Sequence, residues 1–483
     1  MNVPQHRADA VFALPRLPAT ARLLGNLPGW AEDLSERRIE VVGSGERADV
    51  VVADPAHATD AAALDAPSLI VDGRARLASE IAARHPAVMR LLPVPLTGSP
   101  VLFVNLGHRR AARYAIERGV VHAERWRNAR NRAAALLAEV GALPAPRGAM
   151  GLAAAAGPPA LVAAAADLSA LPDPQWALLV SLGSIVRRDA FLLFPAGSRT
   201  PAYVLKFSRV PGFTAQFDRD ERGAEAVRRA GGIVARHAPS YLGRLELDGR
   251  PASLETAAVG MKLTSFLGRM ISGRAKLAAV EPVAAWLIAL ARETVAPPEA
   301  LAPERERIER EVLPAWNELL LPADLLDRIP PIPATFLHND VAEENIVVSD
   351  DGFIVLDWEW AHPHGLPLSD LLYFGVHVLR IIDGALTEEE RDRHFVEVLA
   401  GNAQSSPVLF RWVRELVSVL DLPPDSVGPL ATVSWLDRGL LSLTERRRAE
   451  EVGGAPLDPA FAERVASKWM QHPALGPSWS AWR

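Results

Sequence analysis

The stretch from His338 to Asp357 carries residues whose types and spacing could do chemistry. The carboxylate of Asp340 is placed to meet a substrate hydroxyl, and the amide of Asn345 follows five residues later. A second carboxylate, Asp357, comes twelve residues after that asparagine. Magnesium prefers the oxygens of Asp and Asn, and phosphoryl transfer needs positioned oxygens and metal more than covalent help. The pattern therefore predicts a phosphoryl-transfer centre.

Short apolar runs must position these residues. Residues 334–337 form an apolar run before the motif, and residues 346–348 and 353–356 are β-branched or apolar runs on either side of a turn signal at 349–352. This arrangement predicts a loop followed by a two-stranded ribbon, with Asp357 at the exit of the second strand.

Three neighbouring residues have less direct roles. His338 is predicted to organise the loop through hydrogen bonds rather than to catalyse. Glu343 and Glu344 are predicted to form a solvated loop face; the alternative is that they attract a cationic substrate.

The stretch 336–374 resembles the catalytic segment of the aminoglycoside phosphotransferase and choline kinase superfamily, which has the protein-kinase-like fold. That family carries His-x-Asp-x-x-x-x-Asn, then a strand ending in Asp-aromatic-Glu, then an Asp in a Pro-containing segment. The matching residues here are His338, Asp340, Asn345, Asp357-Trp358-Glu359, Pro367 and Asp370.

The resemblance implies a chemical role for each matched residue. Asp340 would be the catalytic base, Asn345 and Asp357 would bind Mg²⁺, and ATP would be the phosphoryl donor. The acceptor would be a hydroxyl of a small molecule of aminoglycoside, amino alcohol or sugar type. Asn339 departs from the Gly common in the aminoglycoside branch, and this Asn, with the aromatic Trp360, is more usual in the choline and ethanolamine kinase branch.

Residues 161–262 resemble the small lobe of that fold. Strands are predicted at 176–180, 190–194 and 202–207, and Lys206 interrupts the apolar run of the third. An unpaired buried ammonium is costly, so this lysine needs an anionic partner. By resemblance Lys206 contacts the ATP phosphates, and Glu221, or alternatively Glu225, on the next helix pairs with it. The competing interpretation is an edge-strand lysine that reaches solvent.

Two other segments of this lobe are predicted to meet the nucleotide. Ser181, Gly183 and Ser184 form a turn whose amides and hydroxyls could contact a phosphate. Residues 254–263 resemble the connection between the lobes, where Glu255 and Ala257 would lie beside the adenine.

Residues 263–483 are predicted to be mainly helical, with the catalytic loop and the acceptor pocket, and Pro314 should split the helix at 304–320. Four tryptophans are aromatic candidates for that pocket, although burial in the core is the more common role of such residues: Trp360, Trp412, Trp435 and Trp469.

The chain before this lobe matches no family that we recognise. Residues 1–145 alternate short strands with helices and predict a small α/β domain, and a Pro- and Gly-rich linker is expected at 146–160. The fold class is therefore predicted to be α+β: a bilobal protein-kinase-like fold preceded by a small α/β domain.

Composition limits the other possibilities. The chain has 483 residues, a net charge of −6 and no long basic run, which argues against nucleic acid as a partner. Cysteine is absent, which excludes disulfides and thiolate chemistry. No membrane span or targeting segment is expected, and the cytoplasm is the predicted location.

Three other functions stay open. A protein kinase is disfavoured because Asp357-Trp358-Glu359 stands where Asp-Phe-Gly would. A nucleotide-binding scaffold would lack a metal ligand, yet all are present. In the third alternative, the N-terminal region carries a second activity.

Overall fold

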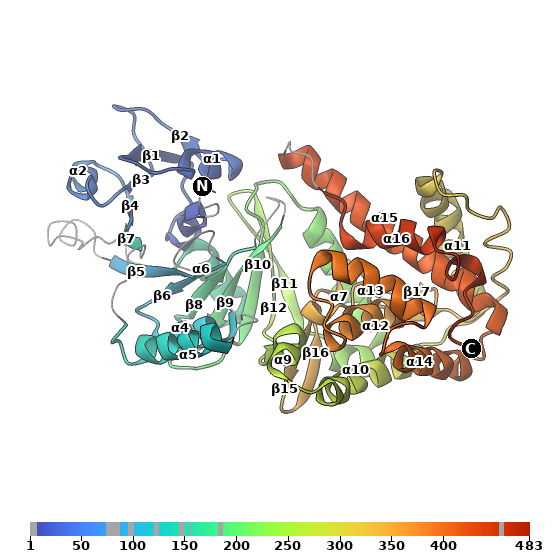
Figure 1. The fold of residues 1–483 in the computed structure, drawn as a ribbon. Coiled ribbons are helices and arrows are strands. Elements are labelled where there is room, and N and C mark those ends of the chain that lie inside the picture. Colours follow the sequence, from blue (N-terminus) through green and yellow to red (C-terminus); the bar gives the residue numbers. More distant parts are fainter. Residues whose placement is uncertain are drawn as a thin grey trace. The chain divides into compact units, whose positions relative to one another are not determined.

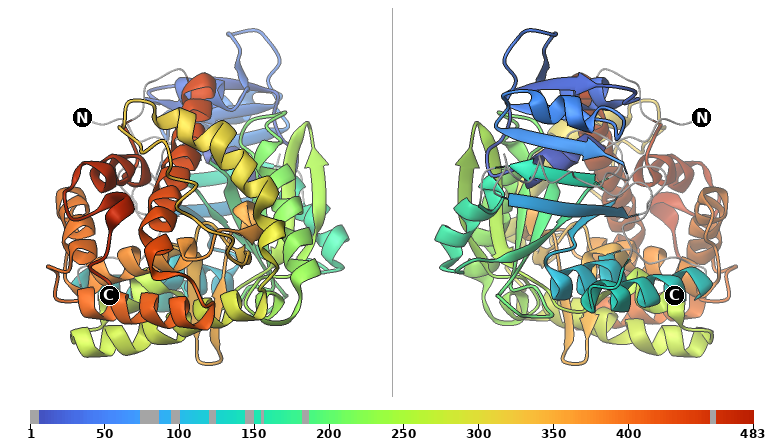
Figure 2. Two further views of the ribbon diagram at one scale, coloured as in Figure 1. Left: turned by 90° about the vertical axis from the view of Figure 1, so that its right-hand side faces the viewer. Right: turned by 90° about the vertical axis from the view of Figure 1, so that its left-hand side faces the viewer.

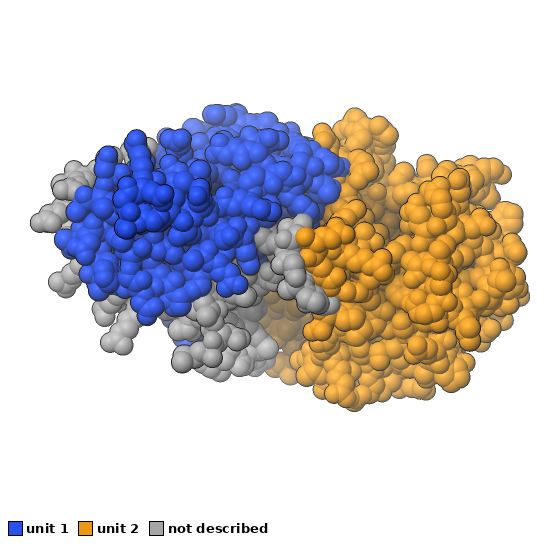
Figure 3. All heavy atoms as spheres, turned by 90° about the horizontal axis from the view of Figure 1, so that it is seen from above, with its two compact units in different colours: residues 1–218, 240–259 blue, residues 219–239, 260–483 orange. Residues whose placement is uncertain are grey.

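A computed structural model describes residues 7–73, 87–94, 101–119, 125–143, 150–154, 157–181, 187–453 and 458–483. Contacts divide the chain into two compact units (Figure 3). Unit 1 comprises residues 1–218 and 240–259, and unit 2 comprises residues 219–239 and 260–483. Unit 1 is built on a large sheet and unit 2 is mostly helical, so the predicted α+β class is confirmed.

One sheet of twelve described strands forms the centre of unit 1, in the order β11-β12-β10-β9-β8-β6-β5-β7-β4-β3-β1-β2 (Figure 1). Neighbours are antiparallel from β11 to β4 and parallel from β4 to β2. The strands are β1 (Thr20–Leu24), β2 (Glu40–Val41), β3 (Val50–Ala53), β4 (Ser68–Asp72), β5 (Ala87–Val94), β6 (Leu102–Asn105), β7 (Met150–Ala154), β8 (Gln175–Leu179), β9 (Asp189–Phe194), β10 (Tyr203–Phe207), β11 (Tyr241–Leu247) and β12 (Arg250–Thr256).

Helices cover this sheet and close its cores. Phe12 of η1 packs against Phe207 of β10, with ring centroids 4.9 Å apart. Ala111 and Ala115 of α4 belong to a second cluster with Phe194 of β9. The described helical segments of unit 1 are η1 (Arg7–Ala13), α1 (Trp30–Glu36), α2 (Ala58–Ala63), α4 (Arg109–Gly119), α5 (Arg125–Glu139) and α6 (Ala160–Ser169).

The structure divides the chain differently from the expected order of small domain, linker and lobe. Strand β6, expected in a separate domain at 1–145, pairs with β8 of the lobe expected at 161–262. Strand β7 falls inside the linker expected at 146–160 and pairs with β4 and β5. Glycine and alanine in this segment resemble a linker in composition, but their backbone groups complete the sheet.

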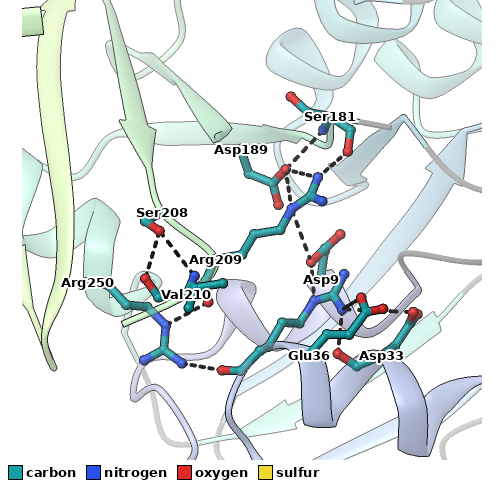
Figure 4. A network of polar contacts seen from close by, with 10 residues as sticks. Asp9, Asp33, Glu36, Ser181, Asp189, Ser208, Arg209, Val210 and Arg250 are labelled. Atoms are coloured by element: carbon teal, nitrogen blue, oxygen red, sulfur yellow. Dashed lines mark hydrogen bonds and ion pairs between the residues drawn. The ribbon is translucent and has the colours of Figure 1, made fainter. Parts of the chain in front are cut away.

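A network of buried charges ties the first forty residues of unit 1 to its later strands (Figure 4). Arg37 contacts Asp9 at 2.5 Å, and Arg209 contacts Asp189 at 2.5 Å and approaches Asp9 to 3.9 Å. All four of these side chains are fully buried. Arg250 donates to the carbonyls of Arg209 and Arg37. Because removing one partner would leave a buried charge unpaired, the network couples these segments.

Unit 2 is mainly helical, as predicted. Pro314 lies in a short 3₁₀ turn after α11 and a π-helical turn, so the helix predicted at 304–320 is broken there. The helices are α7 (Ala215–Ala230, beginning in unit 1), α8 (Gly232–Arg236), α9 (Leu263–Arg269), α10 (Gly273–Glu293), α11 (Ala302–Arg307), α12 (Ser369–Ile382), α13 (Glu388–Ala400), α14 (Ser406–Val419), α15 (Val427–Gly453) and α16 (Phe461–Gln471).

Short strands carry the catalytic segment of unit 2. The predicted ribbon is present as β15 (Ile346–Ser349) and β16 (Gly352–Val355), orange in Figure 2, with Ser349 opposite Gly352. Strand β13 (Met261–Lys262) adds to β15, and β14 (Thr335–Leu337) pairs with β17 (His362–Gly365). The ribbon is therefore braced on one side before it reaches Asp357.

Within the described ranges, none of the helices combines the length and the apolar character needed to cross a membrane.

Candidate functional site

His338 is the first residue of the loop after β14 (Thr335–Leu337), and it is fully buried. Its Nδ1 accepts the amide of Asp340 at 3.1 Å, so Nε2 carries the proton that is donated to the carbonyl of Leu356 at 2.8 Å. Burial lowers the pKa of His338, which keeps the ring neutral. These contacts fit its predicted role as a loop organiser.

Asp370, at the start of α12, holds the first two residues of the loop. Its two carboxylate oxygens accept the amides of His338 and Asn339 at 2.6 and 2.9 Å. Asn339 has a φ of 62°, in the left-handed region that Gly and Asn tolerate best. Asn339 therefore suits the backbone conformation of this position.

Asp340 and Asn345 face each other across the loop. The side-chain amide of Asn345 donates to the Oδ2 atom of Asp340 at 2.8 Å and to its carbonyl at 2.9 Å. The Asp340 side chain keeps 31% of its surface exposed, whereas Asn345 is buried. The loop thus presents one oriented carboxylate to solvent.

Asp357 is placed by the backbone of the residue before it. Leu356 donates its amide to the carbonyl of Asn345 at 2.7 Å and gives its own carbonyl to His338. Asp357 itself has a φ of 58°, a left-handed conformation that costs free energy in a residue other than glycine. These contacts join Asn345 to Asp340 and place the backbone of Leu356, next to Asp357, beside Asn345; a shared site of the three side chains stays a prediction.

The prediction that Glu343 belongs to a solvated loop face is wrong. It is 3% exposed, and its carboxylate contacts Nδ1 of His377 at 2.9 Å and the guanidinium of Arg380, both on α12. Burial acts to raise the pKa of Glu343, but His377 and Arg380 outweigh it and lower the pKa to about 2. Only Glu344 is exposed as expected.

The donor atoms fit a hard cation. The Nδ2 atom of Asn345 is used in the loop, which directs the Oδ1 atom of Asn345 away from Asp340. Among the described residues there is no cluster of three or more His, Asp or Glu side chains that could enclose a metal ion. An Asn and an Asp suit Mg²⁺, which usually takes its other ligands from phosphates and water.

Two arginines that were not predicted from the sequence contact this segment. Arg438 of α15 contacts the Oδ1 atom of Asp340 at 2.7 Å. Arg219 of α7 pairs with Glu359 at 3.2 Å and lies 4.3 Å from the ring centroid of Trp360. Neither lies near the motif in the chain, and each sits in an ordinary helical pattern, so no local signal marks it.

Helix α7 lies directly against the Asp357-Trp358-Glu359 segment. A Cβ atom on Gly223 would come within 2.0 Å of the Trp358 carbonyl, so only glycine fits at that position. With the Arg219–Glu359 pair, this contact holds the Asp357-Trp358-Glu359 segment to α7.

Lys206 lies on β10 of unit 1 and is 13% exposed. Its Nζ atom contacts Glu255 on the adjacent strand β12 at 2.9 Å. Glu255 is the diagonal neighbour on the same face, because Lys206 is opposite Ser253. The anionic partner that the sequence required is therefore found in the sheet. Pairing with Glu221 stays a prediction, and the Glu225 carboxylate is engaged by Arg228 and Arg229.

The predicted nucleotide-contacting backbone is partly engaged elsewhere. Ser181 gives its amide to Asp189 and its hydroxyl to the carbonyl of Arg188. Ala257 gives its amide to the carbonyl of Ala202 at 2.8 Å. A nucleotide would have to use other atoms of Ser181 and Ala257. Gly183 and Ser184 lie outside the described residues.

Three of the four candidate tryptophans are core residues. Trp412, Trp435 and Trp469 are at most 1% exposed, in agreement with the alternative of burial in the core. Only Trp360 keeps a partly exposed ring.

A cavity of about 900 Å³ lies in unit 2 beside the catalytic strands. Helix α7, the residues after α10 and strand β17 line it, and Phe336 of β14 contributes to its wall. Its lining does not include Asp340, Asn345 or Asp357, so it is distinct from the catalytic loop.

A family model matches the part of the chain that contains this loop. Residues 240–416 match the phosphotransferase enzyme family (APH), which confirms the resemblance over a segment that includes the whole catalytic loop. A search of curated protein sequences finds no match.

Solved structures of kinases and phosphotransferases are similar to this chain at low identity. An aminoglycoside-3'-phosphotransferase of type VIII is 15% identical, covers 57% of this chain and 97% of its own, and has a TM-score of 0.34. A mutant PknI kinase domain of Mycobacterium tuberculosis is 16% identical, with coverages of 44% and 76% and a TM-score of 0.25. WbdD, crystallised with a kinase inhibitor, is 11% identical, with coverages of 84% and 84% and a TM-score of 0.27.

Proposed function

We propose that this protein is an ATP- and Mg²⁺-dependent phosphotransferase that phosphorylates a hydroxyl of a small polar molecule. The acceptor would be of aminoglycoside, amino alcohol or sugar type. The observation that carries the proposal is the partly exposed carboxylate of Asp340, which Asn345 holds in one orientation. The match of residues 240–416 to the phosphotransferase enzyme family supports the same reaction class.

Each residue has a defined part in this proposal. Asp340 accepts or orients the proton of the acceptor hydroxyl, a role that suits a carboxylate with one accessible side. Asn345 and Asp357 hold Mg²⁺, which when bound offsets the charge of the nucleotide phosphates. Lys206 contacts phosphate, and Glu255 keeps its ammonium in place.

Several finer predictions accompany this proposal. It stays a prediction that Glu221 pairs with Lys206. The same holds for nucleotide contacts of Ser181, Glu255 and Ala257, and for the cytoplasm as the location.

The first experiment is to measure ADP release from ATP and Mg²⁺ across a panel of amino alcohols, sugars and aminoglycosides. Turnover with one acceptor class that disappears in Asp340→Asn would support the proposal and identify the acceptor class. The matched control is Asp351→Asn, because Asp351 is an exposed turn residue of the β15–β16 ribbon and should leave turnover unchanged.

A negative result would also be informative. ATP binding without turnover for any acceptor would contradict the phosphotransferase and favour the nucleotide-binding scaffold. A reaction that continues unchanged in Asp340→Asn would show that another group performs it.

A further inference from the structure

The carboxylate of Asp340 is held from two sides. Asn345 donates to Oδ2 at 2.8 Å from within the loop, and Arg438 donates to Oδ1 at 2.7 Å from helix α15. Two hydrogen bonds to different oxygens fix the rotation of a carboxylate as well as its position. An acceptor hydroxyl can then approach only the remaining lone pairs.

Arg438 is itself firmly held. Its side chain is 11% exposed, and its guanidinium lies 4.0 Å from the ring centroid of Tyr373, which is buried on α12. One turn earlier, the hydroxyls of Ser369 and Ser434 meet at 2.6 Å and join α12 to α15. Both helices therefore fix this guanidinium.

The neighbouring charges leave Arg438 directed at the loop. The adjacent Asp437 is engaged by Arg307 at 2.8 Å. Burial acts to lower the pKa of Arg438, but Tyr373 and Asp340 together raise it, so the side chain stays a cation. Within the described part of the chain, its Nε atom is buried without a hydrogen-bond partner. An incompletely satisfied buried cation is costly, and stability alone does not explain it.

We propose that Arg438 is a positioning residue for the phosphoryl transfer, and that it holds the carboxylate of Asp340 in the orientation that meets the acceptor hydroxyl. This inference rests on the proposed function of Asp340. A purely structural role would tie α15 to the loop without affecting the chemical step.

Kinetics separates these roles. In Arg438→Gln, kcat should fall by about 100-fold, because a displacement of about 1 Å at a catalytic group can lower the rate by that factor. The KM for ATP should change by less than about 2-fold. Arg438→Lys should recover part of kcat, since an ammonium supplies a charged donor but not the planar stack on Tyr373. The matched control is Arg446→Gln on the same helix, which pairs with Glu450 and Glu463 and should leave kcat unchanged.

Crystal structures of wild type and Arg438→Gln give a readout that needs no activity. The inference expects the Asp340 carboxylate to rotate or shift in the variant while α15 stays folded. An unmoved carboxylate would overturn it, and so would an unchanged kcat in an active enzyme. A raised KM for the acceptor at constant kcat would also overturn it, because Arg438 would then be an acceptor contact.

The same pair of measurements distinguishes the two proposals. Suppose that the wild type transfers no phosphoryl group to any acceptor, and that the carboxylate is displaced in Arg438→Gln. This result would show that Arg438 orients Asp340, and it would reject the proposed function. If Arg438→Gln fails to fold, the Arg438→Lys variant carries both readouts.

Discussion

Unit 1 and unit 2 each contain a network of buried arginines and carboxylates, and the two differ in the exposure of the carboxylates that lie closest to the arginines. Glu36, which is 3.8 Å from Arg37 and 47% exposed, lies at the edge of the network in unit 1. In unit 1, Asp9, Arg37, Asp189 and Arg209 are fully buried and contact one another (Figure 4). In unit 2, Arg438 is nearly as buried, but the carboxylate that it contacts is 31% exposed.

This difference separates charged groups that stabilise the fold from charged groups that can take part in a reaction. The four fully buried residues of unit 1 form a sealed network that exposes no atom to a substrate, so this network contributes by holding together the segments that it joins. An open network directs one carboxylate outward and uses its buried members to fix that carboxylate. Similar residue types therefore serve different purposes according to exposure.

The sharpest test of the comparison is to break both networks. Arg209→Met leaves Asp189 buried without its cation, and the free energy of unfolding of unit 1 should fall by about 3–5 kcal/mol. Asp340→Asn keeps a partly exposed oxygen beside Arg438, so it should lower the stability of unit 2 by only about 1–2 kcal/mol while it removes turnover. Hydrogen exchange measured by mass spectrometry reads the stability of each unit. Equal destabilisation by the two substitutions would refute the distinction.

Glu343 tests whether burial, rather than loop position, decides the role of a glutamate. Glu343→Gln replaces a carboxylate that pairs with His377 and Arg380, and it should destabilise unit 2 by about 2–3 kcal/mol. The matched control is Glu344→Gln, one residue later and exposed, with an expected change below about 0.5 kcal/mol. Urea denaturation of both variants measures the difference, and similar midpoints would contradict the buried pairing.

The free energy of unfolding of unit 1 should also depend on pH, through Asp33. Burial raises the pKa of Asp33 from 3.8 to about 6, against the lowering effect of Arg37 and with smaller contributions from Asp9 and Glu36. Below this pKa the folded protein binds a proton that the unfolded chain does not, so this group favours folding more as pH falls from 7.5 to 5. The gain should be about 1.4 kcal/mol at pH 5.

Asp33→Asn provides the control for this pH effect. The amide cannot ionise, so the unfolding free energy of the wild type minus that of the variant should rise by that amount between pH 7.5 and pH 5. Unfolding measured at both pH values checks it, and a constant difference would mean that Asp33 has an ordinary pKa in the folded protein.

The local parts of the site could be predicted from the sequence. The His-x-Asp loop, Asn345 and the ribbon that ends before Asp357 are encoded in residues close in the chain, and their spacing and strand patterns are visible without the fold. The helices of unit 2 and the break at Pro314 follow for the same reason, because helical periodicity and the geometry of proline act over a few residues.

The remaining features depended on partners far away in the chain. Glu343 has the polar type of a solvated residue and is buried only because α12 brings His377 and Arg380 to it. Strand β6 pairs with β8 across about seventy residues, which merges two expected domains into one sheet. Arg438 reaches Asp340 from 98 positions away. Residue types and local periodicity by themselves determined what chemistry is available, whereas only the tertiary structure decided which charges are buried and which carboxylate is presented, because burial and pairing depend on contacts that no local pattern records.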